Sequence, residues 1–595
     1  MTVKTSVETS KDINKPEQLI TEHIDIWTSA ILAKSTNGRG SGKKYELYGI
    51  TKLRELILEL AVRGKLVPQD ANDEPASVLL EKIEAEKAQL IKDKKIKKPK
   101  KLAKISDDEH YFSTPQGWHW SRLNDIGEWG AGATPSRSNS KYYGGGIPWF
   151  KSGELSEDYI SVSQETITES ALKETSIREN KSGDVLLAMY GATIGKASIL
   201  EVAGTTNQAV CACTPFSGVT NTFLLMLLKA YRARFIGMGA GGAQPNISRE
   251  KIIATVIALP PTAEQKRIVA KVDELMLLCD QLEQQTEASI DAHATLVDVL
   301  LATLTESSDA DELTQNWARM AEHFDSLFTT EQSIEALKQT VLQLAVMGKL
   351  VPQNPEDEPA SVLLEKIAEE KEQLVEQGEI RKSKSLDKVN EEEKLYDLPF
   401  NWEWTRLGDI AAVGTGATPS RNESKYWSSQ DINWVSSGET SEPFIFDTKE
   451  KVSHLAIKET NVSVYPPGTL VVAMYGQGKT RGQITELKIE AGTNQACAAI
   501  RLIQLDELHR YYIKLFFWKS YEEIRSNAAG GAQPNLNVSK ITSTVIPLPP
   551  LAEQHRIVAK VDELMTICNQ LKVKLQQSQE TQVQLTDALI DRALG

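Results

Sequence analysis

One segment of the sequence comes close to a site for nucleotide phosphates. AMYGQGKTRG (473–482) approaches the G-x-x-x-x-G-K-[ST] loop, in which backbone amides surround the phosphates and a lysine reaches the outermost ones. Ala473 stands where the first glycine belongs, however. The similar stretch AMYGATIGKA (188–197) has neither the spacing nor a Ser or Thr after Lys196. A P-loop-like ATPase is therefore kept only as a minor alternative.

Other catalytic groupings are missing from the sequence. The Pro-Pro pairs read LPPT, YPPG and LPPL, so none forms the Asn/Asp-Pro-Pro-aromatic motif with which adenine methyltransferases hold a flipped base. There is no G-x-S-x-G, no H-E-x-x-H and no C-x-x-C, and the eight histidines show no paired spacing. We therefore expect no catalytic residue, no metal site and no reaction carried out by this chain alone.

The sequence is instead a tandem repeat with a period of nearly 290 residues. The repeated motifs include GKLVPQ (64–69, 348–353), GATPSR (132–137, 416–421), AMYG (188–191, 473–476), TNQA (206–209, 493–496), GGAQPN (241–246, 530–535) and RIVAKVDELM (267–276, 556–565). This period is far longer than that of solenoid repeats. Two folded modules related by a pseudo-two-fold axis are the natural interpretation.

The pattern changes within each repeat, and these changes predict its elements. Apolar residues at three- and four-residue spacing in 53–66 and 334–350 indicate helices that end at a glycine. The Gly-, Ser- and Thr-rich middle, with short apolar runs, suits a compact mixed α/β domain. LPP then ends the domain, and Pro261 and Pro550 are well placed to open a long helix.

That long helix carries a heptad pattern, which favours a coiled coil. The predicted seam is Ile268, Val272, Leu275, Cys279 and Leu282, continuing through Thr286, Ser289, His293, Leu296 and Leu300. Its counterpart is Ile557, Val561, Leu564, Cys568 and Leu571, continuing through Leu575, Ser578, Gln582, Leu585 and Leu589. The two cysteines are interpreted as core residues. The alternative is that each helix packs on its own domain.

Charge is distributed unevenly along the 595 residues, whose net charge is −14. Segment 112–260 has 13 Lys+Arg against 12 Asp+Glu, and 396–548 has 15 against 16, whereas 261–395 has 13 against 29. The acid therefore belongs to the connecting helices. A near-neutral domain can still bind DNA through local basic loops, but partners would have to contribute charge for a firm grip.

The predicted fold class is α+β, with two mixed α/β domains separated by long helices in an antiparallel coiled coil. The expected segments are 1–111 (mostly helical, with a basic linker), 112–260 (first domain), 261–395 (central helical region with a helix over 263–304), 396–548 (second domain) and 549–595 (C-terminal helix). The absence of a long apolar run, of a signal peptide and of paired cysteines favours the bacterial cytoplasm.

Several of these motifs together resemble a known family. Trp-x-Trp stands before each domain (118–120, 402–404), each domain carries GATPSR and GGAQPN, and each is followed by LPPxxEQxRIV (259–269, 548–558). From about residue 45 onward, the chain resembles the specificity subunit of a Type I restriction-modification system, with the LPPxxEQxRIV helix start as the most specific element.

The resemblance implies a division of labour. The first domain would read one half of a bipartite, asymmetric DNA target and the second the other half. The two long helices would pair antiparallel and set the unread spacer. Two methyltransferase (M) subunits using S-adenosylmethionine, and restriction/translocase (R) subunits using ATP and Mg²⁺, would do the chemistry. This chain itself would need no cofactor.

Loops that combine glycine with hydrogen-bonding side chains are candidates for DNA contact, because such side chains bind base edges and phosphates. The candidates are Arg137, Lys141, Tyr142, Tyr190, Thr193, Lys196, Gln208, Gln244, Arg421, Lys425, Tyr426, Tyr475, Gln477, Lys479, Arg481, Gln495 and Gln533. The two domains should read different half-sites, so identical positions more plausibly hold the fold or touch the backbone. Differing residues, such as 192–194 against 477–479, are the better base readers.

Two further questions stay open at this point. The basic run KDKKIKKPKKLAK (92–104) either lies along phosphates or is a solvated linker, as an acidic VNEEEK (389–394) in the second repeat would suggest. A duplicated scaffold that binds proteins, with the coil as a spacer, is the rival function.

Overall fold

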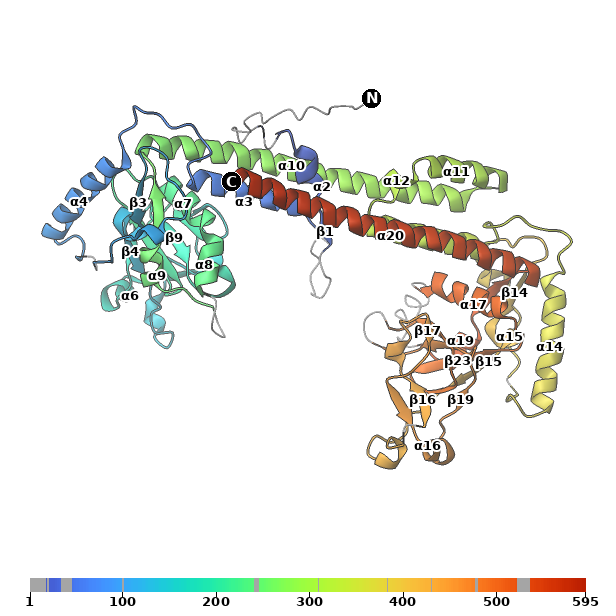
Figure 1. The fold of residues 1–595 in the computed structure, drawn as a ribbon. Helices are drawn as coiled ribbons and strands as arrows, with labels where there is room; N and C mark the ends of the chain where they lie inside the picture. Colours follow the sequence, from blue (N-terminus) through green and yellow to red (C-terminus); the bar gives the residue numbers. More distant parts are fainter. Residues whose placement is uncertain are drawn as a thin grey trace, which may run out of the picture. The chain divides into compact units, whose positions relative to one another are not determined.

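The computed structural model describes residues 18, 21–33, 45–98, 101–239, 245–308, 310–382, 384–429, 431–476, 480–521 and 536–595. The chain divides into two compact units (Figure 1). Unit 1 combines residues 1–289 with 578–595, and unit 2 comprises 290–577. Each unit holds one copy of the repeat.

Unit 1 contains a mixed domain built on two sheets. Its helices are α2 (Ile24–Ser29), α3 (Tyr48–Val62), α4 (Ala76–Lys92), α5 (Leu123–Ile126), α6 (Glu169–Glu174), α7 (Asn221–Ala230), α8 (Arg232–Gly239) and α9 (Arg249–Ala254). Its strands are β1 (Leu32–Ala33), β2 (Tyr45–Glu46), β3 (His119–Arg122), β4 (Gly127–Ala131), β5 (Tyr143–Phe150), β6 (Tyr159–Ile160), β7 (Glu165–Ile167), β8 (Glu179–Asn180), β9 (Val185–Ala188), β10 (Ala197–Leu200), β11 (Gly204–Thr206), β12 (Val210–Pro215) and β13 (Val256–Leu259). One sheet has the order β4-β12-β9-β10-β6 and the other β7-β5-β11-β8.

The strand runs explain why these sheets are buried. β9 and β10 are buried at every position, and β12 at its first four, as expected for continuous apolar runs covered on both faces. Helix α7 packs on β9 and β10 and also against α3. Antiparallel pairing of β3 with β13 brings the beginning and end of the domain together.

Unit 2 repeats this arrangement. Its helices are α11 (Ala310–Glu322), α12 (Phe324–Leu327), α13 (Glu331–Val346), α14 (Ala360–Glu376), α15 (Leu407–Ile410), α16 (His454–Glu459), α17 (Glu507–Lys519) and α19 (Val538–Thr542). Its strands are β14 (Glu403–Arg406), β15 (Ala411–Thr415), β16 (Ile432–Val435), β17 (Phe444–Ile445), β18 (Glu450–Val452), β19 (Val464–Tyr465), β20 (Leu470–Ala473), β21 (Ile484–Leu487), β22 (Ala491–Thr493), β23 (Cys497–Leu502) and β24 (Val545–Leu548). The sheet orders β15-β23-β20-β21-β17 and β18-β16-β22-β19 match those of unit 1, so the predicted duplication and fold class are confirmed.

The two long helices, α10 (Thr262–Glu306) and α20 (Leu551–Leu594), each contribute to both units. α10 begins in unit 1 and ends in unit 2, whereas α20 begins in unit 2 and ends in unit 1. The expected antiparallel arrangement follows from these opposite directions. Their observed bounds lie within a few residues of the predicted ones.

A third helix joins this pair in each unit. In unit 1, Arg54 of α3 forms ion pairs with Asp280 (2.6 Å) and Glu283 (2.5 Å) of α10, and Tyr48 donates to Asp587 of α20 (2.8 Å). In unit 2, α13 shares one buried core with the last part of α10 and the first part of α20. Each unit therefore contains a three-helix arrangement in place of a simple two-stranded coil.

The first half of the predicted seam is buried, whereas the second half is buried only in part. The ten positions of the first half are all buried: Ile268, Val272, Leu275, Cys279, Leu282, Ile557, Val561, Leu564, Cys568 and Leu571. Beyond them, Leu296 is 50% and Leu585 46% exposed, whereas the neighbouring Val297 and Thr586 are buried. Of the other continued positions, Leu589 is buried and Leu300 and Leu575 pack against the core of unit 2, whereas Ser289 and Ser578 are exposed. The continued heptad therefore holds only in part, because a straight helix with 3.6 residues per turn drifts from a strict seven-residue repeat.

Among the described helices, α10 alone is long and apolar enough to be compared with a membrane span. Its apolar positions Val297, Leu301 and Leu304 are buried in the core of unit 2.

Candidate nucleic-acid interface

The repeated motifs meet at one edge of the five-stranded sheet in unit 1. β4 and β9 end there and β12 and β10 begin there, so the loops between these strands lie side by side. Backbone hydrogen bonds join them: Ala133 N–H donates to Thr206 O (3.0 Å), and Gly191 N–H donates to Pro245 O (2.8 Å). We call residues 132–137, 189–196, 206–209 and 245–247 the loop edge of unit 1.

In unit 2, the equivalent strands meet at the equivalent edge of the five-stranded sheet. Its loop edge consists of residues 416–421, 474–476, 480–482 and 493–496. Met474 N–H donates to Ala496 O (2.7 Å), as Met189 N–H donates to Ala209 O (2.8 Å). The fold therefore brings motifs that are far apart in sequence to one surface in each unit.

The glycine that opens GATPSR is required by close packing at this edge. A Cβ on Gly132 would overlap the backbone oxygens of Thr206 and Asn207, and one on Gly416 would overlap the backbone of Thr493. Backbone cannot move aside as a flexible side chain could. Only glycine fits at these two positions.

The arginine of the same motif is held inside its own domain. Arg137 pairs with Glu165 (2.6 Å) and lies over the rings of Tyr143 (4.7 Å to the centroid) and Trp149 (5.0 Å). The hydrogen bond to Glu165 raises the pKa of Arg137, and Arg137 and Lys151 together lower the pKa of Glu165. This guanidinium is engaged by its stacking and by its ion pair.

Arg421 of unit 2 has the same surroundings. It pairs with Glu450 (2.5 Å) and lies 4.0 Å from the centroid of Trp427 and 5.4 Å from that of Trp434. The hydrogen bond to Glu450 raises the pKa of Arg421. Both copies therefore use this arginine to join the loop to the four-stranded sheet.

Other repeat-identical candidates also have partners in their own domain. Tyr142 donates to Glu174 and Tyr426 to Glu459, each at 3.1 Å. The corresponding hydroxyl–amide pairs are Thr134–Gln208 and Thr418–Gln495. Lys425 pairs with Glu459 (2.8 Å), whereas Lys141 is exposed. These contacts support the interpretation that identical positions hold the loops in place.

Most of the remaining candidates lie between β9 and β10 or in the equivalent segment between β20 and β21. Tyr190 is 42% and Tyr475 36% exposed, and Thr193 donates to the backbone oxygen of Tyr190 (2.7 Å). Lys196 and Arg481 are half-buried. Gln244, Gln477, Lys479 and Gln533 lie outside the described residues.

One basic residue near this edge was missed by reasoning from sequence. Arg232, at the start of α8, is exposed, and a Cβ on Gly195 would lie 2.6 Å from its Cγ. Ile236, one turn further along α8, is 48% exposed. The sequence signal that could have pointed to Arg232 was an arginine in the helical segment immediately before GGAQPN.

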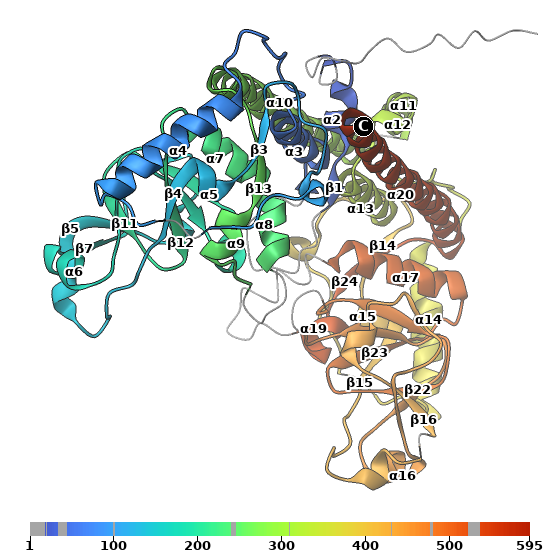
Figure 2. The same ribbon diagram turned by 60° about the vertical axis from the view of Figure 1, so that its left-hand side comes forward.

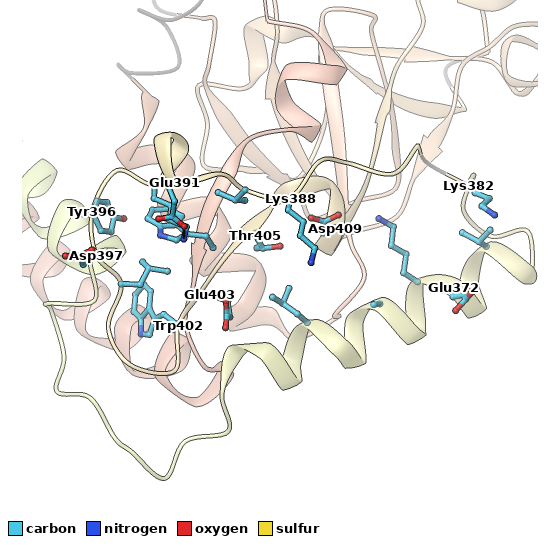
Figure 3. Close-up of a pocket in the computed structure, with 18 of the residues that line it drawn as sticks. Glu372, Lys382, Lys388, Glu391, Tyr396, Asp397, Trp402, Glu403, Thr405 and Asp409 are labelled. Atoms are coloured by element: carbon cyan, nitrogen blue, oxygen red, sulfur yellow. Dashed lines mark hydrogen bonds and ion pairs between the residues drawn. The ribbon is translucent and has the colours of Figure 1, made fainter.

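A cavity of about 1210 Å³ lies elsewhere in unit 2, between α14 and the segment that leads to β14 (Figure 3). Lysines and carboxylates both line it, among them Lys371, Lys388, Glu372, Glu391 and Asp409. This mixture of charges has no preference for an anion. The loop edges remain the candidate interface.

The sequence matches a known protein family. The family model described as "Type I restriction modification DNA specificity domain" matches residues 115–292 and 399–580. The chain is 40% identical to the Type I restriction enzyme EcoEI specificity subunit of Escherichia coli, over 97% of this chain and 100% of that one. It is 38% identical to the EcoAI specificity subunit of the same organism, with the same coverage.

A solved structure, the HsdS subunit from Thermoanaerobacter tengcongensis, is 19% identical, with a TM-score of 0.41 over 82% of this chain and 98% of that one. The family model covers more than half of the chain, and two relatives match along nearly all of it. The chain therefore belongs to the family of Type I restriction-modification specificity subunits.

Proposed function

We propose that the chain selects a bipartite, asymmetric DNA sequence, with the loop edge of unit 1 reading one half and that of unit 2 the other. The observation that carries this proposal is the duplication of the loop edge. Residues identical in both copies, such as Arg137 and Arg421, are engaged within their domains, whereas residues 192–194 and 477–479 differ. Two domains that share their structural loop residues but differ in others are suited to recognising different half-sites.

The chemistry would belong to partner subunits. M subunits would bring S-adenosylmethionine and methylate adenine, and R subunits would bring ATP and Mg²⁺ and cleave unmodified DNA. The chain would supply specificity and docking, without a catalytic residue or cofactor of its own. The complex would work in the bacterial cytoplasm, on the nucleoid.

The test is methylation mapping. Methylation-sensitive long-read sequencing of cells that express the chain with its partner subunits should show one two-part motif. The purified chain with S-adenosylmethionine should methylate nothing. Exchanging residues 112–260 for the matching domain of a relative should change one half-site and preserve the other.

Two results would overturn the proposal. Methylation by the isolated chain would make it an enzyme. Binding without any sequence selection, in the presence of the methyltransferase, would favour the rival function of a protein-binding scaffold.

A further inference from the structure

The segment that follows α4 is the most basic stretch of the chain. Residues 92–104, which we call the basic strap, contain eight lysines and one aspartate. The lysines that the structure describes are exposed: Lys92, Lys94, Lys95, Lys97, Lys98, Lys101 and Lys104. Among these, only Lys95 has an ion pair, with Asp93 at 3.6 Å. The basic strap is therefore a concentrated positive charge that the domain itself does not neutralise.

The structure identifies the counterpart of the basic strap. Buried Arg122 donates from Nε to Ala103 O (3.2 Å), and its equivalent Arg406 donates from Nε to Asp387 O (2.6 Å). The counterpart is therefore 376–388, the second strap, with four basic and three acidic residues. VNEEEK (389–394) aligns instead with the equally acidic ISDDEH (105–110), so the comparison drawn from sequence was wrong. The asymmetry is between a strongly basic strap and a nearly neutral one.

The basic strap is fixed at Ala103, close to the loop edge of unit 1. Besides Ala103 O, Arg122 donates to Ala254 O (2.6 Å) at the end of α9, and it pairs with Glu109 (3.0 Å). Helix α9 has six residues and starts directly after the loop edge, so its two ends are about 9 Å apart. Figure 2 shows the described part of the strap leaving α4 and running past α9. A duplex on the loop edge would have its phosphates within reach of these lysines.

One lysine of the basic strap has a backbone conformation that favours glycine. Lys94 adopts a left-handed conformation, with φ of 57°, where α4 ends. The equivalent residue after α14 is Gly378, with φ of 75°. Glycine reaches this region at no steric cost, whereas a residue with a Cβ does not. The first repeat thus holds a charge where the second holds the residue best suited to the turn.

We propose that the basic strap lies along the phosphate backbone of duplex DNA beside the half-site that unit 1 reads. The second strap has no such role, so the two units contribute unequally to affinity and unit 1 supplies most of the salt-dependent grip. This inference rests on the proposed function, because it takes the loop edge of unit 1 as the DNA-reading surface. To the proposed function it adds that the first repeat binds the DNA backbone more strongly, through contacts between lysines and phosphates.

The test compares matched variants of the full chain assembled with its partner subunits. The first-strap variant combines Lys97→Gln, Lys98→Gln, Lys101→Gln and Lys104→Gln. The second-strap control combines Arg381→Gln, Lys382→Gln, Lys384→Gln and Lys388→Gln. Affinity for a fluorescein-labelled duplex of random sequence is measured by anisotropy over a series of KCl concentrations. Circular dichroism and melting temperature check the folding of each variant.

The first-strap variant should bind at least about tenfold more weakly at low salt. The slope of log affinity against log salt should fall by about 3 to 4, because each lost phosphate contact removes about 0.9. The control should change affinity less than about threefold, with its slope within about 1 of the parent. Equal slopes for the parent and the first-strap variant would overturn the proposal, and so would equal losses in both variants.

Lys94→Gly separates binding from folding. It should melt no lower than the parent, because glycine suits the turn, yet lose about one unit of salt slope. An unchanged salt slope in Lys94→Gly would show that Lys94 does not contact a phosphate, which would contradict the proposal. Loss of partner assembly by the first-strap variant, with DNA binding unchanged, would mean that the strap binds protein.

Failure of this inference can be told from failure of the proposed function. If methylation mapping shows a two-part motif but the salt slope does not change, only the strap assignment is wrong. If the slope falls as expected but the parent selects no sequence, the strap binds DNA and the proposed function is wrong.

Discussion

Trp118 and Glu264 are joined by a buried hydrogen bond of 2.9 Å from the indole Nε1 to the carboxylate Oε2, and Trp402 and Glu553 repeat it at 3.0 Å. The other carboxylate oxygen accepts from Gln69 (3.2 Å) or Gln353 (2.7 Å). One carboxylate thus ties the start of a domain, the repeated GKLVPQ segment and the first turn of a long helix together. Burial raises the pKa of both glutamates.

Removing the indole donor should weaken this joint. Trp118→Phe leaves Oε2 of Glu264 buried without its donor, which costs about 1 to 3 kcal/mol. Urea unfolding followed by circular dichroism measures the loss. Trp120→Phe is the control, because Trp120 stacks on His110 and also contacts the rings of Tyr111 (edge-on) and Phe112 (tilted). Equal losses from both substitutions would mean that ring volume matters and the hydrogen bond does not.

A buried lysine should make the stability of unit 2 depend on pH. Lys514 is fully buried, donates to Pro443 O, and lies 3.7 Å from the centroid of Phe444 and 4.0 Å from Glu486. Desolvation lowers the pKa of Lys514 from 10.5 to about 8. Between these values the unfolded chain holds more protons, so stability should rise with pH. Urea midpoints measured from pH 7 to about 9.5 should increase.

Lys514→Met is the matched variant for this effect. The equivalent residue in unit 1, counted from the helix N-caps Thr220 and Asp506, is the buried Leu228, so an apolar side chain fits this fold. Glu486 keeps Lys488 (2.9 Å) and Arg510 (3.1 Å) as partners. The variant should be at least as stable as the parent at pH 7. A rise with pH that persists in the variant would assign the titration to another group.

All five cysteines should be unreactive in the native protein. Cys211, Cys213, Cys279, Cys497 and Cys568 are free and buried. Burial raises the pKa of Cys211 and Cys497 to about 12 and that of Cys279 to about 11, so little thiolate exists at pH 8. A thiol reagent such as DTNB should react with none of them until urea is added. Native reaction at the rate of free cysteine would show that the sheets or the long helices open readily.

The long helices give a prediction about the spacer between half-sites. Seven residues added after Thr286 and seven after Leu575 preserve the apolar faces and lengthen each helix by about 10 Å. Methylation mapping should then show the original half-sites separated by about three more base pairs. Two residues added to one helix should disrupt packing and weaken assembly. An unchanged spacer in the heptad variant would mean that these helices do not set the distance.

The sequence was informative where the two repeats could be compared. Identity at GATPSR pointed to a structural role, and Arg137 and Arg421 are indeed engaged within their domains. The mixed domains and both long helices followed from pattern changes and from the prolines at 261 and 550. Side-chain types were not enough in the second half of each long helix, because exposed Leu296 and Leu585 are apolar whereas buried Thr586 is not.

Relationships between distant segments could not be read from one sequence. The third helix in each unit depends on contacts such as Arg54 with Asp280, more than two hundred residues apart. The meeting of four loops at one sheet edge depends on strand order, which local patterns do not specify. The true counterpart of the basic strap emerged only from the equivalent contacts of Arg122 and Arg406.

The last turns of α20 belong to the unit that contains the start of the chain. Lys65 donates to the backbone oxygen of Leu594 (2.6 Å), and residues 578–595 count among the compact contacts of unit 1. During synthesis, the unit that leaves the ribosome first must therefore wait for residues 578–595 before its helices are complete. A premature stop near residue 578 would spare the domain encoded last and damage the one encoded first. Mutations in the codons of residues 578–595 should thus change the reading of the first half-site.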